Sequence, residues 1–484
     1  MDRHRRLLLV SVGLLYAAGI NGQWRLGPDT AMHATIGQAL SMGGGYEQLL
    51  GAAEGASPGL PYLLAVQFRL FGPHTMWPAV LFMSVLGLGI VFLTYRLMRL
   101  HANRAVAVFT ACALGITATF YRHTLEVSTD LPFMAGLMLF LLGHERTQHS
   151  AGRAWVSYLL MACGLAAMAV FRFVVIVVVA AVVAGLLLHS VRQRRWSPLM
   201  LALLLVCCLL AVRLVDPRTA SFGSLLLKKE HQAVTMITEL PQTLAHAVTV
   251  NAPRTLFEVG PEGLLGNQLG ADPINALFTV VAFAAGILLL RRRLLWGLLV
   301  GLFLLQWLLF LPDVRYFLPV LPLLIFAWWR AARWTLAVVP GRAGASVAIV
   351  MIGLWVAMNV GRTVGVVFDQ RGMPFAEHYE NGRYVGIEEL GRALGRSTEP
   401  GSTILTAGKW HWPLWFYSGR RAVNPHMLPR TGDGPLYVVE PLGEDERRLV
   451  EQKQWRLAAP LVSVKRARGR PPLVARRVET RTGG

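Results

Sequence analysis

Long apolar runs separated by arginine-rich links constrain this sequence more than any other feature. Runs of about 17–25 apolar residues are long enough to cross the hydrocarbon core of a bilayer as helices. The chain has 484 residues, of which 54% are hydrophobic, more than a soluble domain normally carries. These runs predict an α-helical polytopic membrane protein with about eleven spans. The expected spans are 7–22, 76–95, 105–121, 131–143, 155–170, 173–189, 198–214, 273–290, 294–311, 317–333 and 343–360.

The arginines between the runs predict the orientation of the chain. Loops on the cytoplasmic side of a membrane are enriched in Lys and Arg. If the N-terminus lies inside, the arginine-rich links fall on the inner side and the short outer loops hold far fewer arginines. We therefore expect a multi-pass protein of the cell membrane with a cytoplasmic N-terminus, its first run retained as a signal anchor. The inner links would hold Arg3, Arg5, Arg6, Arg96, Arg99, Arg104, Arg146, Arg153, Arg192, Arg194, Arg195, Arg291, Arg292, Arg293, Arg330, Arg333 and Arg342.

The formal charge of +20 reflects these links in large part. No basic patch with interleaved aromatic residues appears in a soluble segment, so nucleic acid is not an expected partner, whereas membrane lipids are. All four cysteines lie inside apolar runs. The C-terminal segment therefore offers neither a disulfide framework nor a cysteine-based zinc site.

The pattern changes after residue 360, which predicts two domains. Residues 1–360 form the transmembrane domain, and residues 361–484 form a small extracytoplasmic α/β domain with a basic tail. Short β-branched and apolar runs predict the strands of this second domain, and amphipathic or acidic stretches predict its helices. The expected strands are 403–407, 436–440, 457–465 and 472–478, and the expected helices are 383–394 and one that begins near 442–446.

Two long loops face the outer side in this topology. The first, about 23–75, has helix-compatible residues at 30–42, a run of three glycines, and a second apolar segment at 58–72. Both segments are expected to be interfacial helices that lie along the membrane surface. The other loop, 215–272, carries several charged residues and could cover a site as a lid.

Acidic residues occur twice at this predicted outer side. Asp29 follows the first run, and Glu126 and Asp130 follow the third. Asp29 and Asp130 each precede a helical pattern and could be helix N-caps. Desolvation at the membrane surface would instead suit Asp29 as a general base or as an anchor for a metal or an acceptor. Glu126 and Asp130 would share one face if their segment is helical, and His123 makes a divalent metal conceivable there.

Two arginines could bind phosphate at the same side. Arg172 interrupts an apolar run that is too long for one span, and a tight turn there removes the cost of an arginine in lipid. Arg315 and Tyr316 begin a late span. All three could be interfacial anchors, or the guanidinium groups could hold phosphate oxygens. Lys409 and His411 could contact an acceptor or only cap a strand.

Taken in order, these segments resemble the GT-C superfamily of integral-membrane glycosyltransferases. The likeness is to the branch that includes dolichyl-phosphate-mannose protein mannosyltransferases and the aminoarabinose transferase of lipid A. The segments that carry it are Asp29, 30–42, 43–46, 57–62, 68–72, Glu126 with Asp130, 171–173, and Arg315 with Tyr316, Pro319 and Pro322. Two positions depart from the pattern, because Thr30 stands where many members have a second acid and Ser57 stands where His or Tyr is usual.

The resemblance implies inverting transfer of a sugar from a polyprenyl-phosphate donor to an acceptor at the outer membrane face. Asp29 would act as base or acceptor anchor, and Asp130 and Glu126 would support it or orient the donor. Arg172, Arg315 and Tyr316 would bind the donor phosphate, and His33, Lys409 and His411 would be acceptor or accessory residues. No cofactor is required, a divalent metal is compatible with the site, and the acceptor could be a lipid, a glycan or a protein.

Two other functions are compatible with a polytopic chain of this kind. A transporter or flippase for a lipid-linked substrate is one, although such proteins tend to show duplicated halves and broken spans near the membrane midplane. No convincing internal repeat appears in the sequence, and its polar groups gather at one side. A non-catalytic membrane scaffold with a sensing tail is the other.

Overall fold

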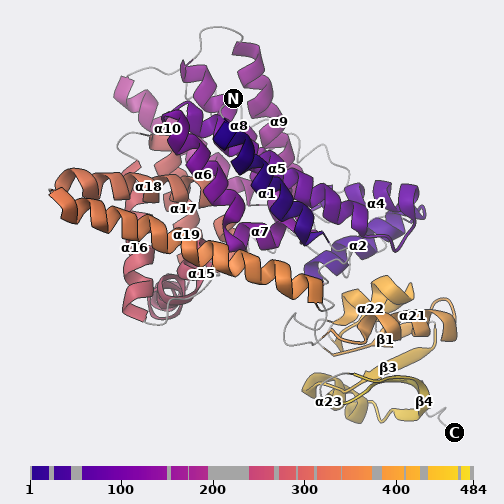
Figure 1. Cartoon of the computed structure of the whole chain (residues 1–484). Coiled ribbons are helices and arrows are strands. Elements are labelled where there is room, and N and C mark those ends of the chain that lie inside the picture. The colour runs from indigo at the N-terminus through magenta and orange to yellow at the C-terminus, as the bar shows by residue number, and fades with distance from the viewer. Residues whose placement is uncertain are drawn as a thin grey trace. The chain divides into compact units, whose positions relative to one another are not determined.

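The computed structural model is mostly helical, with one small sheet near the C-terminus (Figure 1). The contacts between residues divide the chain into two compact units. The first comprises Met1–Ile20, Leu81–Leu125 and Thr129–Asp369, and the second comprises Asn21–Val80, Glu126–Ser128 and Gln370–Gly484. The structure describes residues 3–20, 27–44, 57–149, 154–172, 174–193, 239–265, 272–289, 293–309, 313–339, 341–372, 384–407, 410–425, 434–466 and 470–479.

Apolar helices lie at each predicted span except 198–214, which is outside the described residues. They are α1 (Arg3–Gly19), α5 (Trp77–Arg99), α6 (Arg104–Ile116), α7 (Ala118–Thr124), α8 (Asp130–His149), α9 (Ala154–Phe171), α10 (Val175–Gln193), α16 (Asp272–Leu288), α17 (Leu294–Leu309), α18 (Leu321–Val338) and α19 (Gly341–Gly372). Within the described part of the chain, three helices are long and apolar enough to cross a membrane, or four if α6 and α7 form one bent span. Five shorter apolar helices accompany them. A total of eleven spans stays a prediction.

The apolar helices break at Thr117 and again near Arg172. α6 and α7 meet at Thr117 with a bend of 62°. The predicted turn after the fifth span is confirmed, because α9 ends at Phe171 and α10 begins at Val175. Arg172 therefore lies in the link between two helices.

Glycines let α8 and α9 pack backbone against backbone. A Cβ added at Gly136 would lie 2.8 Å from the carbonyl oxygen of Gly164, and one added at Gly143 would lie 2.6 Å from that of Ser157. Small residues at such a contact allow close approach of membrane helices, where packing rather than the hydrophobic effect drives association. The start of α8 is thereby fixed beside the end of α9.

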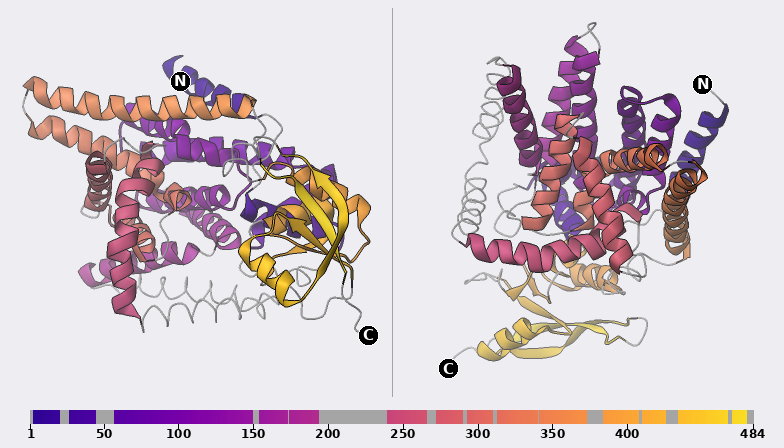
Figure 2. Two further views of the ribbon diagram at one scale, coloured as in Figure 1. Left: turned by 90° about the horizontal axis from the view of Figure 1, so that it is seen from below. Right: turned by 90° about the vertical axis from the view of Figure 1, so that its left-hand side faces the viewer.

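The described part of the 215–272 loop is helical. Residues 240–265 alternate α-helical and π-helical turns: α13 (Leu240–His246), η1 (Ala247–Asn251), α14 (Ala252–Arg254), η2 (Thr255–Val259) and α15 (Gly260–Leu265). In the right-hand view of Figure 2 this segment crosses the direction of α16 and α17. Its last turn packs against the 3-10 turn η4 (Val314–Val320), because Gly263 leaves room for the ring of Phe317. A lid function for this loop stays a prediction.

The second unit joins the loop between α1 and α5 to the C-terminal domain. The two helices predicted in that loop are confirmed as α2 (Pro28–Ser41) and α4 (Gly59–Phe71). The Thr35 hydroxyl of α2 donates to the carbonyl oxygen of Trp412 at 3.4 Å, and the rings of Phe68 and Phe416 lie 6.1 Å apart. Trp412 and Phe416 belong to α22 (His411–Ser418), so the C-terminal domain packs on α2 and α4.

A five-stranded mixed sheet forms the centre of the C-terminal domain, with strand order β2-β1-β3-β5-β4. Strand β1 pairs in parallel with β2 and β3, whereas β5 pairs antiparallel with β3 and β4. Helices α21 and α22 lie on one side of the sheet and α23 on the other (Figure 1). The elements are β1 (Thr403–Leu405), β2 (Arg421–Val423), β3 (Leu436–Glu440), β4 (Arg456–Val464), β5 (Leu473–Glu479), α21 (Ile387–Ser397) and α23 (Glu444–Gln452).

The predicted strands of this domain coincide with β1, β3, β4 and β5, and the predicted helices with α21 and α23. Strand β2 and helix α22 are not among the elements predicted from the sequence. Strand β2 has only three residues, too few for alternation to show. Helix α22 carries four aromatic residues and a proline among eight positions, so it lacks the polar face that marks an amphipathic helix.

Candidate active site

Asp130 and Arg172 form a buried ion pair in the first unit. Asp130 is the first residue of α8, where a carboxylate is stabilised by the positive end of the helix dipole. The Arg172 guanidinium reaches its Oδ1 from the link between α9 and α10. The two side chains are only 6% and 12% exposed, so water screens the pair weakly. Asp130 is therefore paired with Arg172 in this conformation.

Tyr316 connects Arg172 to the second predicted arginine. The Arg172 guanidinium carbon lies 5.0 Å from the centroid of the Tyr316 ring, and that of Arg315 lies 5.3 Å from it. Both distances are within the range of a cation–π contact. The structure thus brings together the three residues predicted to bind a phosphate, although Arg172 is far in sequence from Arg315 and Tyr316.

Asp313 holds Arg315 in place. Its side chain caps η4 by accepting a hydrogen bond from the Arg315 amide at 3.0 Å, and its other oxygen lies 3.3 Å from the Arg315 Nε. These side chains are partly exposed, at 37% and 32%. Asp313 is not among the residues predicted from the sequence, although an Asp two residues before an Arg at a helix start is a recognisable capping pattern.

The cluster of Asp130, Arg172, Asp313, Arg315 and Tyr316 is called the arginine–tyrosine site below. A guanidinium carries five N–H donors in a planar fork, so it can serve a carboxylate and a second anion at once. Here one side chain pair is buried and the other is partly exposed. The arrangement can receive an anionic group next to Tyr316, with two positive charges already oriented.

Asp29 lies in the second unit, in the first turn of α2. It is exposed. The prediction that it is the N-cap is wrong, because Gly27 occupies that position and Pro28 begins the helix. Proline is favoured at the first helical position, since its missing N–H has no helical partner to lose. Asp29 instead contributes a carboxylate to the first turn, where the helix dipole favours it.

The second acidic pair is not helical as predicted. Residues 125–129 form a turn and a bend between α7 and α8, so Glu126 and Asp130 do not share a helical face. The reason is that α7 ends at Thr124 and a new helix begins only at Asp130. Glu126 is half-buried and belongs to the second unit, whereas Asp130 belongs to the first.

The predicted accessory residues have different surroundings. His33 is buried in α2, and His411 is buried at the start of α22, with its ring 5.3 Å from that of Trp412. Lys409 lies outside the described residues. Within the described ranges, no three His, Cys, Asp or Glu side chains are grouped as metal ligands would be.

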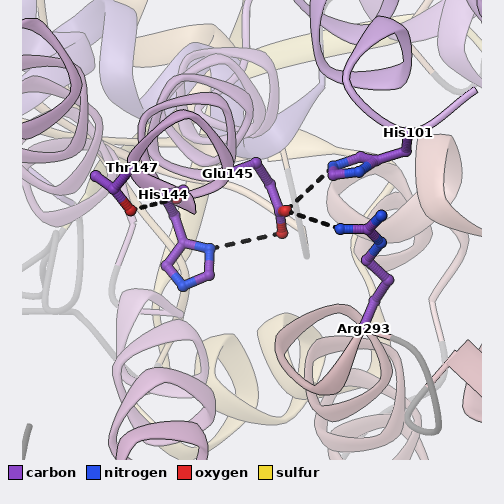
Figure 3. A network of polar contacts seen from close by, with 5 residues as sticks. All are labelled: His101, His144, Glu145, Thr147 and Arg293. Carbon is purple, nitrogen blue, oxygen red and sulfur yellow. Dashed lines mark hydrogen bonds and ion pairs between the residues drawn. The ribbon is translucent and has the colours of Figure 1, made fainter. Parts of the chain in front are cut away.

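A second polar cluster, also missed from the sequence, lies at the far end of α8. Glu145 is 3.1 Å from the Nε2 of His101, 3.5 Å from the Nδ1 of His144 and 3.3 Å from the Nη1 of Arg293 (Figure 3). Burial alone would raise the pKa of Glu145, but the hydrogen bonds and charges of His101 and His144 lower it overall. His101 and Arg293 are far from Glu145 in sequence, so no local pattern reveals the cluster.

The chain is similar to known membrane glycosyltransferases. A family model described as dolichyl-phosphate-mannose-protein mannosyltransferase matches residues 55–217. ArnT from Cupriavidus metallidurans gives a TM-score of 0.55 at 13% identity, and 97% of each chain is covered. Its structure bound to undecaprenyl phosphate gives the same values. The apo oligosaccharyltransferase of Archaeoglobus fulgidus gives a TM-score of 0.58 at 11% identity over 90% of this chain and 69% of that one.

A comparison with curated proteins finds no match in sequence. The family model and the structural matches nevertheless confirm the predicted resemblance to the GT-C superfamily, in the branch of protein mannosyltransferases and ArnT. The fold is therefore that of a membrane glycosyltransferase.

Proposed function

We propose that this protein transfers a sugar from a polyprenyl-phosphate donor to an acceptor at the outer face of the membrane. The observation that carries the proposal is the arginine–tyrosine site, where two guanidinium groups lie against one tyrosine ring. The similarity to ArnT, which has been seen with undecaprenyl phosphate, supports a lipid phosphate as the bound group. A lipid-linked donor also explains why the site belongs to a bundle of apolar helices.

In the proposed reaction, an acceptor hydroxyl oxygen attacks the anomeric carbon of the sugar from the side opposite the phosphate. A new carbon–oxygen bond forms as the bond from that carbon to the phosphate oxygen breaks, which inverts the configuration. The phosphate oxygen leaves with the bonding electrons. Arg172 and Arg315 stabilise the negative charge that grows on it, which is the main electrostatic task in a transfer of this kind.

Asp29 is the proposed acceptor of the hydroxyl proton. It is the predicted acid that remains exposed, whereas Asp130 is buried against Arg172. Asp130 is therefore assigned to orienting Arg172, and the half-buried Glu126 to supporting the acceptor. The acceptor roles of Lys409, His33 and His411 are part of the same proposal, although burial of the two histidines favours packing for them.

The test compares the cell envelope of cells with and without the protein by mass spectrometry of glycans, polymers and lipids. Loss of a sugar from one of these molecules, restored by wild type and not by Asp29→Asn, is the expected result. An Asp29→Asn protein that restores the sugar would overturn the role of Asp29. No molecule that loses a sugar would favour a scaffold, and a change only in the membrane side on which a lipid-linked sugar is found would favour a flippase.

A further inference from the structure

Helix α19 contacts the rest of the first unit through one stripe of residues. Only 24% of the apolar stretch of this helix is buried within the protein. Yet Trp355, Asn359 and Thr363, spaced four residues apart and therefore on one face, are at most 3% exposed. Two polar side chains on a largely apolar helix are costly in a membrane unless they are hydrogen-bonded. Their partners therefore indicate what they are for.

Both polar side chains bind the break between α6 and α7. The Ala118 amide, at the start of α7, donates to the Oδ1 of Asn359 at 3.2 Å. The Thr363 hydroxyl donates to the carbonyl oxygen of Ile116, at the end of α6, at 2.9 Å. A helix end leaves backbone groups without helical partners, and these two residues supply partners on each side of the bend. The bend is thus held by α19 (Figure 1).

Asn359 also reaches the end of α15. Its Nδ2 donates to the carbonyl oxygen of Leu264 at 3.0 Å, and the Thr119 hydroxyl of α7 donates to that of Glu262 at 2.7 Å. Between these two carbonyls lies Gly263, where an added Cβ would lie 2.8 Å from the ring of Phe317. Phe317 is wholly buried and directly follows Tyr316.

We propose that Asn359 and Thr363 are positioning residues that hold Arg315 and Tyr316 in place through the α6–α7 bend and α15. They do not contact the arginine–tyrosine site. Loss of their hydrogen bonds leaves buried backbone groups without partners, so α15 is expected to shift against Phe317. The expected consequence, weaker binding of a lipid phosphate, rests on the proposed function. The coupling between α19 and η4 does not depend on it.

Asn359→Leu removes both the donor and the acceptor of the amide while keeping the number of side-chain heavy atoms, and Asn251→Leu is its matched control. Asn251 is also a buried asparagine that joins two elements, since its Nδ2 donates to the carbonyl oxygen of Leu308 at 2.8 Å. Thr363→Val removes one hydroxyl, and Thr363→Ser keeps it. This milder pair keeps the test open if Asn359→Leu does not fold.

Two readouts are measured on the full-length protein in lipid nanodiscs: amide hydrogen exchange and the affinity for undecaprenyl phosphate. Asn359→Leu is expected to speed exchange of the first amides of α7 and of η4 by about tenfold or more, from one lost buried hydrogen bond. Its affinity for undecaprenyl phosphate should fall by about fivefold. Thr363→Val should change both the exchange and the affinity less, and Thr363→Ser should behave like wild type. Asn251→Leu should melt earlier yet keep both the η4 exchange and the affinity.

Unchanged exchange in η4 for Asn359→Leu, or for Thr363→Val if the former does not fold, would overturn the positioning role. Equal loss of affinity in Asn251→Leu would also overturn it, because general destabilisation would then explain the effect. If wild type and an Arg172→Ala variant bind undecaprenyl phosphate equally, the proposed function fails, and the exchange pattern alone decides whether α19 positions η4.

Discussion

The two ends of α8 carry similar side chains in different arrangements. Asp130 begins the helix and Glu145 lies fifteen residues later, which is about 22 Å along its axis. Glu145 is surrounded by His101, His144 and Arg293, and its side chain and that of His101 are 3% and 1% exposed. At the other end, each carboxylate meets one arginine, and one of the two pairs is partly exposed.

The difference indicates a division of labour. His144 of α8 contacts the Glu145 carboxylate, and His101 and Arg293 join that carboxylate to the links before α6 and α17, so this end ties α8 to two other parts of the bundle. The arginine–tyrosine site is open on its Asp313–Arg315 side, and its two guanidinium groups contact one ring. The acids are paired at both ends, but Asp313 is partly exposed whereas Glu145 is buried, so a second anion can approach Arg315 beside its partner.

The largest effect is expected for Arg172→Ala, which leaves the buried Asp130 carboxylate without its ion pair. Breaking such a pair costs about 3–5 kcal/mol, because a charge stays buried without compensation. Sugar transfer should fall by at least about a hundredfold, since the proposed phosphate-binding group is lost as well. Unfolding and turnover measured on purified protein check both. The double variant Arg172→Met with Asp130→Leu should regain stability but not transfer; regained transfer would contradict the role of Arg172.

Glu145→Gln distinguishes the stabilising role proposed for one end of α8 from the binding role proposed for the other. It should lower the free energy of unfolding by about 1–3 kcal/mol through lost charged hydrogen bonds, while affinity for undecaprenyl phosphate stays as in wild type. Weaker binding in this variant would contradict the division of labour.

The same residue gives a pH prediction. Glu145 lies beyond the predicted span 131–143, and its pKa is lowered in the folded protein. The stabilisation is therefore present above the unfolded pKa of about 4.3 and is lost as the pH falls through the folded value. The stability difference between wild type and Glu145→Gln should be constant near neutral pH and shrink below about pH 4. A difference that disappears already at pH 6 would mean that the histidines, not Glu145, control it.

A smaller effect is expected for Tyr316→Leu, which removes both cation–π contacts. Each contact of this kind contributes about 0.5–1 kcal/mol at a partly exposed site, so loss of both should lower the affinity for undecaprenyl phosphate by about fivefold to thirtyfold. Tyr316→Phe keeps the ring and is the matched control. If both variants lose the same affinity, the hydroxyl rather than the ring is the important group.

The smallest effect is expected for Asp313→Asn, which keeps the capping oxygen and removes the charge. The Asp313–Arg315 pair is about one-third exposed, and exposed pairs contribute little, so affinity should change by about threefold or less. Isothermal titration with undecaprenyl phosphate in nanodiscs checks it. A change as large as that of Arg172→Ala would show that the open side of the site is not open to solvent.

The sequence predicts the parts of this protein that follow from local patterns. Apolar runs locate the helices, the arginine in a run predicts the turn at Arg172, and Asp29 and Arg315 are found from their places after or before a run. Gly27 shows the limit of such reasoning, because the helix starts earlier than the acid suggests. Asp313 is visible only as a capping pattern.

Residues that act through long-range contacts could not be predicted in this way. Glu145 meets His101 and Arg293 only because α8, the α5–α6 link and the start of α17 converge. Asn359 meets Ala118 and Leu264 only because α19 lies along the α6–α7 bend. Such contacts depend on how helices pack, which the order of residues along one helix does not specify.

The most direct test of the central claim is the ³¹P NMR signal of undecaprenyl phosphate in nanodiscs that contain the protein. The account predicts a shifted or broadened phosphate signal with wild type and with Glu145→Gln. Arg315→Ala and Arg172→Ala should return it to the signal of empty nanodiscs. The same signal with wild type and with both arginine variants would contradict the proposal that this site holds the donor phosphate.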